Sequence, residues 1–144
     1  MNINHTFGTY IKDKRLAKQI SLRKFAELLD ISPVYLCNIE KDRNPAPKDD
    51  IISNMARLLM LNDTETAELY DLAAKAKSNP TISQDLPEYI MDRDIVRVAL
   101  RTAKDVDATD EEWQEFIARL EERRRKNSGG QNDDRNQIPS TGIA

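Results

Sequence analysis

Apolar residues recur at helical spacing along most of the chain, and short polar stretches separate the repeats. The spacing predicts a first helix from Phe7, and two short apolar groups near Phe25 and Leu36 predict a second and a third. The strongly apolar run 51–59 predicts a buried fourth helix, and a fifth is expected to end near Lys77. The positions expected to face a shared core are Phe7, Tyr10, Ile11, Leu16, Phe25, Ala26, Leu29, Leu36, Ile39, Ile51, Ile52, Met55, Ala56, Leu58, Leu59, Leu69, Tyr70, Leu72, Ala73 and Ala76.

Residues 21–43 predict two short helices joined by a tight turn. Ser21 is placed to cap the first of them, and Ser32 followed by Pro33 gives the second an N-cap with proline at its first position. Only two residues separate the helices, so the turn needs positive φ near its start, which Asp30 tolerates better than most residues other than glycine. The outer face of the second helix is small, polar and basic enough to enter a major groove, and consists of Pro33, Val34, Tyr35, Cys37, Asn38 and Lys41.

A dozen residues in and around this stretch agree in type and spacing with a known pattern: Ser21, Leu22, Phe25, Ala26, Ile31, Ser32, Tyr35, Leu36, Ile39, Glu40, Arg43 and Pro47. On these residues, and over about 7–77, the chain resembles the Xre, or lambda-repressor-like, helix-turn-helix family. Asp30 and Asp42 stand where that family favours glycine, and Cys37 where it favours serine. The resemblance implies an all-α protein with a five-helix, lambda-repressor-like DNA-binding domain. It also implies one buried ion pair, between Arg15 and Glu40.

The resemblance implies a sequence-specific DNA-binding regulator, and residue types along the motif fit that expectation. Residues at the start of its first helix and around Arg43 are expected to contact phosphates. The amide of Asn38 suits adenine, Val34 suits a thymine methyl, and Tyr35 suits a phosphate or the groove wall. Cys37 is expected to be a small groove-facing contact and not a redox switch. The candidate DNA-binding residues are Ser21, Arg23, Ser32, Val34, Tyr35, Cys37, Asn38, Lys41 and Arg43.

Charge is distributed unevenly along the 144 residues, although the net charge is only −3. Residues 1–48 carry nine Lys and Arg against five acids, a net charge of +4, which leaves −7 on the remainder. A basic module followed by an acidic one suits a protein whose first part meets phosphates.

The chain has no apolar run long enough to span a membrane and no charged-then-apolar leader, so a soluble, cytoplasmic protein is expected. One cysteine and one histidine cannot form a disulfide or a metal site, so neither a cofactor nor an enzymatic activity is expected.

A polar stretch around 78–85 predicts a boundary between a DNA-binding domain, 1–78, and a second helical segment, 81–126. Thr109 and Glu112 predict a capping box at the start of the last helix. An apolar stripe follows, which either packs onto the preceding helix or mediates self-association: Trp113, Phe116, Ile117 and Leu120. The basic run 123–126 is typical of a helix C-terminus and is a weaker candidate for a second DNA contact. Residues 127–144 are expected to be disordered.

A regulator that reads about four base pairs per copy cannot find a site in a genome alone. The sequence therefore predicts a repressor that binds a two-half-site operator on double-stranded DNA as a homodimer, with the second motif helix in the major groove. The alternative is an antitoxin whose segment 81–126 binds a toxin protein while the helix-turn-helix autoregulates the operon. A repressor of the mobile-element or phage type is also consistent with the resemblance.

Overall fold

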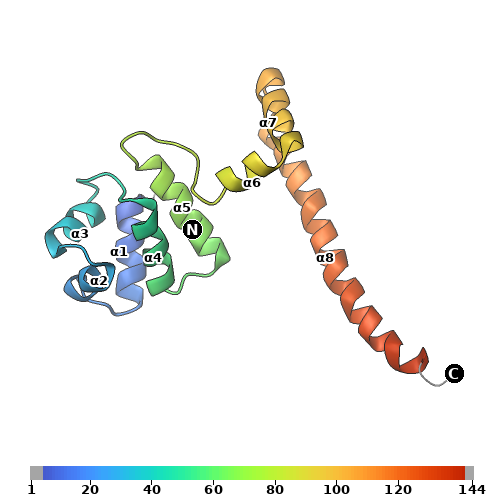
Figure 1. Ribbon diagram of the computed structural model, residues 1–144, viewed down its shortest axis with the longest axis horizontal. Coiled ribbons are helices and arrows are strands. Elements are labelled where there is room, and N and C mark those ends of the chain that lie inside the picture. The colour runs from blue at the N-terminus through green and yellow to red at the C-terminus, as the bar shows by residue number, and fades with distance from the viewer. Residues whose placement is uncertain (1–4, 142–144) are drawn as a thin grey trace. The chain divides into compact units, whose positions relative to one another are not determined.

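The computed structural model describes residues 5–141, and helices are the only regular elements in that range. Figure 1 shows them in chain order. Their bounds are α1 Phe7–Ala17, α2 Leu22–Leu29, α3 Pro33–Glu40, α4 Asp49–Leu58, α5 Asp63–Lys75, α6 Pro87–Asp92, α7 Asp94–Val106 and α8 Asp110–Thr141. The expectation of an all-α protein is confirmed. No helix in the described range is long and apolar enough to cross a membrane.

The chain divides into two compact units, 1–93 and 94–144. This division lies later than the boundary expected at 78–81, because the intervening segment is anchored to the first unit. The Ser83 hydroxyl donates to the carboxylate of Asp71, and the amide of Gln84 donates to the hydroxyl of Ser53 over 2.8 Å. Polar composition alone predicted a linker here, but these side chains dock on α4 and α5.

Helices α1 to α5 share one hydrophobic core within the first unit. Helix α1 contacts α3 and α5, α2 contacts α3 and α4, and α4 contacts α5. Burying a large apolar side chain contributes roughly 1.5–3 kcal/mol, so the fully buried members dominate the stability of this unit. They are Ile11, Phe25, Leu36, Ile39, Ile52, Met55, Leu59 and Leu69.

The first helix differs from its predicted pattern at one apolar position. Leu16 was expected to face the core but is 54% exposed, because the inward face of α1 continues through Arg15. The Arg15 guanidinium is buried and donates to both carboxylate oxygens of Glu40, over 2.7 and 2.9 Å. A third bond runs to the carbonyl oxygen of Ile20 over 2.9 Å. The implied Arg15–Glu40 pair is therefore confirmed, and it joins α1 to the end of α3.

The helix starts follow the capping residues, with one exception. Ser21 and Ser32 cap α2 and α3, and the Thr109–Glu112 capping box is present before α8. For α4, Lys48 occupies the N-cap position without a side-chain bond, and Asp49 and Asp50 lie in the first turn. Carboxylates in the first turn interact favourably with the helix dipole.

Helix α8 continues to Thr141, past the point at which the tail was expected to begin. Side chains of α8 are described as far as Gly129. The structure does not confirm the disordered tail at 127–144, which stays a prediction. Gly129, Gly130 and Pro139 make its distal part a poor sequence for an isolated helix.

Candidate nucleic-acid interface

The turn between α2 and α3 holds the two helices at a fixed angle through backbone bonds and caps. Asp30 adopts the left-handed conformation, with φ 58° and ψ 44°, as its position predicted. The Ile31 amide donates to the carbonyl of Ala26 over 3.0 Å and closes the end of α2. The Ser32 hydroxyl then accepts from the Tyr35 amide over 3.0 Å, starting α3. Each residue between the two helices therefore takes part in a backbone or capping hydrogen bond.

One face of α3 packs into the core and the opposite face is open to solvent. Leu36, Ile39 and Glu40 are buried. Val34 is 71% exposed, and Asn38 and Lys41 follow it at i+4 and i+7, which places the three on one side of the helix. The remaining predicted contacts on α3, Tyr35 and Cys37, are half-buried at its edges, and Ser32 is exposed at its start.

Three exposed cations of the motif have no carboxylate partner. Arg23 lies in the first turn of α2, Lys41 caps the end of α3, and Arg43 follows in the next turn. Within residues 5–129 none of the three makes a hydrogen bond or ion pair through its side chain. Some cations elsewhere in the same unit are paired, such as Lys14 with Glu65 at 2.6 Å and Lys77 with Asp49 at 3.0 Å, whereas others, such as Lys12 and Lys75, are exposed and unpaired as well. The charge on this face thus remains available to an anion from outside the chain.

The starts of α2 and α3 add to the positive potential. Neither helix has an acidic residue in its first turn, so the free N–H groups and the positive end of each helix dipole are not neutralised locally. Such helix starts favour phosphate groups. Ser21 and Ser32, both exposed, lie at these two starts as the sequence predicted.

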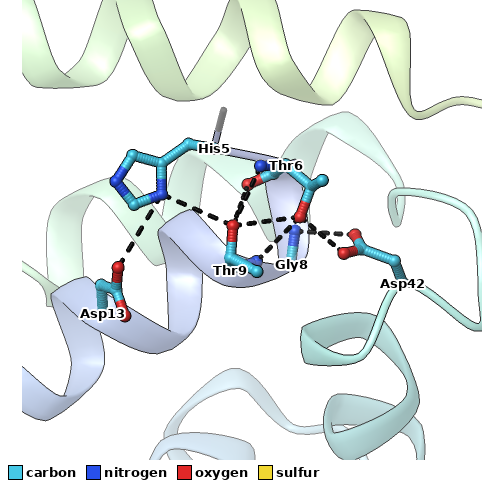
Figure 2. A network of polar contacts seen from close by, with 6 residues as sticks. All are labelled: His5, Thr6, Gly8, Thr9, Asp13 and Asp42. Atoms are coloured by element: carbon cyan, nitrogen blue, oxygen red, sulfur yellow. Dashed lines mark hydrogen bonds and ion pairs between the residues drawn. The ribbon is translucent and has the colours of Figure 1, made fainter. Parts of the chain in front are cut away.

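A polar network couples the turn after α3 to the start of α1 (Figure 2). Asp42 is left-handed, with φ 58°, and its carboxylate accepts from the Gly8 amide over 3.0 Å and from the Thr6 hydroxyl over 2.5 Å. Thr6 and Thr9 form a reciprocal capping box around the same helix start. His5 extends the network, with its Nδ1 3.4 Å from the Thr9 hydroxyl. Asp42 therefore caps a helix that lies more than thirty residues earlier in the chain.

Gly8 is required by the close approach of α1 to the end of α3. A Cβ at this position would lie 2.5 Å from the carbonyl oxygen of Ile39 and 2.6 Å from that of Glu40. These are backbone atoms and cannot move aside easily. Sequence reasoning missed both Gly8 and the role of Asp42. The available signal was the aspartate that replaces the glycine favoured after the third helix.

The predicted residues fall into two groups that belong to different units. All nine candidate DNA-binding residues lie between Ser21 and Arg43, on α2, α3 and the turns beside them. The stripe residues lie on α8 in the second unit, with exposures of 36% for Trp113, 47% for Phe116, 54% for Ile117 and 39% for Leu120. Trp113 and Phe116 contact each other edge to face, with ring centroids 6.3 Å apart.

Comparison of the chain with models of known protein families, with curated proteins and with solved structures finds no match.

Proposed function

We propose that the protein is a sequence-specific DNA-binding transcriptional regulator, a repressor that acts as a homodimer on a two-half-site operator. The observation that carries the proposal is the open face of α3, together with the unpaired cations Arg23, Lys41 and Arg43 of the same motif. A short helix with one buried and one open face, in a motif with unpaired cations, has the dimensions and the charge that a major groove accepts. The resemblance to the Xre, or lambda-repressor-like, family supports the same function.

Contacts to phosphates and contacts to bases come from different parts of the motif. The Ser21 helix start with Arg23, and Lys41 with Arg43, lie on either side of α3 along the chain and would fix the register of the protein on the DNA backbone. Asn38 would pair its amide with an adenine edge, and Val34 would contact a thymine methyl. Affinity then depends mainly on the cations, and discrimination on the face of α3.

The test is selection of bound duplexes from a random library, followed by affinity measurements at several salt concentrations. A protein that displaces condensed cations loses affinity linearly in log salt, with a slope of about −0.9 per phosphate contacted. Lys41→Gln and Arg43→Gln should each reduce the slope by about that amount per copy. Lys12→Gln is the matched control, since Lys12 is an exposed cation on α1 outside the motif, and it should leave the slope unchanged.

No enrichment of any duplex, together with a flat salt dependence, would exclude the proposed function. Equal effects of Lys12→Gln and Lys41→Gln would show that binding follows total charge and not the motif.

A further inference from the structure

The second unit carries apolar side chains that nothing within it covers. Among its described side chains none is buried. Helix α7 presents one apolar stripe at helical spacing, with Ile95 69%, Val98 53% and Val106 68% exposed. This stripe and Trp113 line an open hollow of about 400 Å³ between α7 and the start of α8. Patches of this extent on soluble proteins mark interaction sites.

The size of the apolar face matches what one partner of a stable dimer buries. Seven large side chains contribute to it, and at these exposures they offer roughly 700 Å² per copy. A standard stable interface buries about 800 Å² on each partner. The seven are Ile95, Val98, Val106, Trp113, Phe116, Ile117 and Leu120.

Charge is distributed along α8 in a way that selects one orientation of a partner helix. The first turns are acidic, with four carboxylates within 110–115, and 123–126 is a run of four cations. Seen down the helix, Asp110 and Arg124 border the apolar stripe on one side, and Glu112 and Lys126 lie on the other. A second α8 in the antiparallel direction brings Asp110 and Glu112 near cations, beside the exposed Arg124–Glu121 ion pair within each copy, whereas a parallel one places like charges together.

We infer that the partner of this face is a second copy of the same chain, with the two α8 helices antiparallel about a two-fold axis near position 118. Residues equidistant from that axis face each other, so Phe116 packs against the partner's Leu120. Asp110 lies eight positions before the axis and the partner's Arg124 six positions after it, so on their shared side of the stripe the two side chains come within two positions of the same level and can reach each other. Glu112, six positions before the axis, and the partner's Lys126, eight after it, do the same on the other side. The contact is isologous, so every favourable pair occurs twice. The α7 stripes close over the α8 pair and fill the hollow beside Trp113.

The inference rests on the proposed dimeric function and specifies its interface. Its test is a charge-exchange cycle on the full chain, measured by sedimentation equilibrium. Asp110→Arg and Arg124→Asp each place like charges together in an antiparallel dimer, so each should weaken association. The double variant restores both pairs and should return the dissociation constant towards that of the wild type. In a parallel dimer each of these positions faces its own copy, so the double variant would not restore association.

A cross-linking measurement reports the orientation directly and does not depend on the strength of the ion pairs. In a Cys37→Ser background, a short bis-maleimide should join a copy carrying Asp110→Cys to a copy carrying Arg124→Cys. Asp110→Cys alone should give no covalent dimer. Circular dichroism of each variant separates loss of the dimer from loss of the helix.

Two results would overturn the inference. A wild-type chain that is monomeric at all concentrations would assign the face to a different protein, such as a toxin neutralised by this segment. Covalent dimers of Asp110→Cys alone would establish a parallel arrangement. Binding of a single half-site by the motif does not require the dimer, so retained half-site binding by a monomer overturns this inference and the dimeric part of the proposed function but leaves the proposed DNA binding intact. A dimer without salt-dependent DNA binding overturns only the proposed function.

Discussion

The backbone of Asn38 has a structural role, whereas its side chain makes no hydrogen bond within the described residues. Its carbonyl oxygen accepts the Arg43 amide over 2.9 Å and so shapes the turn that follows α3. Within the described residues its amide side chain makes no hydrogen bond, although the residue is half-buried on the open side of α3. A group held in place and left unbonded is suited to reading a base edge.

Asn38→Ala should reduce affinity for the selected operator by roughly 1–3 kcal/mol and relax discrimination at one base pair per half-site. Affinity for unrelated DNA should change little, because the cations remain. Fluorescence anisotropy with the operator and with single-base variants measures both effects. Asn54→Ala, at an exposed position of α4, is the matched control. Equal losses on operator and unrelated DNA would identify Asn38 as a backbone contact.

Gly8→Ala should destabilise the first unit by roughly 1–3 kcal/mol, because the added methyl group meets the carbonyl oxygens of Ile39 and Glu40. Urea unfolding monitored by circular dichroism measures the change. Gly129→Ala is the matched control, since its Cβ would meet nothing within 4 Å. The control should be neutral or slightly favourable to α8, because alanine has the higher helix propensity. Equal behaviour of the two variants would contradict the close approach.

Single residues show where sequence reasoning succeeds and where it stops. The left-handed Asp30 and the caps Ser21 and Ser32 were predictable, because each depends on residues within a few positions. Asp42 was not, because its carboxylate bonds to Gly8 and Thr6 through tertiary structure. The exposure of Leu16 was missed for a related reason, since the inward position on α1 is taken by a charged residue whose partner lies on α3.

At the scale of elements, α1 and α5 are joined by a polar contact beside the core. Lys14 pairs with Glu65 at 2.6 Å, and the Tyr10 hydroxyl donates to the carbonyl of Glu65 over 3.1 Å. The hydrogen bond from Lys14 and that from the Asn62 amide lower the pKa of Glu65. Burial, with the nearby carboxylates of Glu68 and Glu65, raises the pKa of Tyr10 to about 12. Tyr10 therefore stays protonated throughout the neutral range.

The lowered pKa of Glu65 predicts a dependence of stability on acid pH. Because the folded protein binds this proton less readily than the unfolded chain, its contribution is complete above the ordinary glutamate pKa and is lost as pH falls through the lower, folded value. Urea midpoints measured between about pH 6 and pH 3 should fall towards acid, and less steeply in Glu65→Gln. Glu27→Gln, on an exposed residue of α2, is the control. An unchanged slope in Glu65→Gln would contradict the shift.

The positions of the helices in the first unit were predictable from the sequence, whereas the residue at which the unit ends was not. Periodicity and caps depend on neighbouring residues, so all five helices were expected close to where they lie. The stretch 78–85 has the composition of a linker, and only the bonds from Ser83 and Gln84 to side chains on α5 and α4 show that it is docked. In the candidate interface, the open face of α3 was predictable from the spacing of apolar residues. The bonds that hold α3 to α1 were not, because they join residues far apart in the sequence.

At the scale of the molecule, the hydrophobic core lies entirely in the first unit. Every buried apolar side chain among the described residues lies between Phe7 and Ala74. A chain that ends at Arg93 should therefore keep its core and the docked residues Ser83 and Gln84. A chain that ends at Ser78 would lose that docking, so Arg93 is the better end point.

Residues 1–93 should be monomeric and should bind a single half-site as the full chain does, because the candidate interface is intact. Affinity for the two-half-site operator should fall, since the copies are no longer linked. Sedimentation gives the mass and anisotropy gives both affinities. Trp113→Ala with Phe116→Ala in the full chain should have the same effect. If residues 1–93 remain dimeric, the dimer contact lies within α1–α6.

The bonds between α1 and α3 also determine how far the motif can be treated as a separable part. Arg15 holds Glu40 at one end of this contact, and Asp42 holds Gly8 at the other. Helices α2 and α3 thus owe their mutual alignment to a third helix that precedes them and contributes none of the candidate base contacts. Residues 21–43 grafted into another protein would bring the recognition face without the support that orients it, and a working transplant has to begin at Thr6.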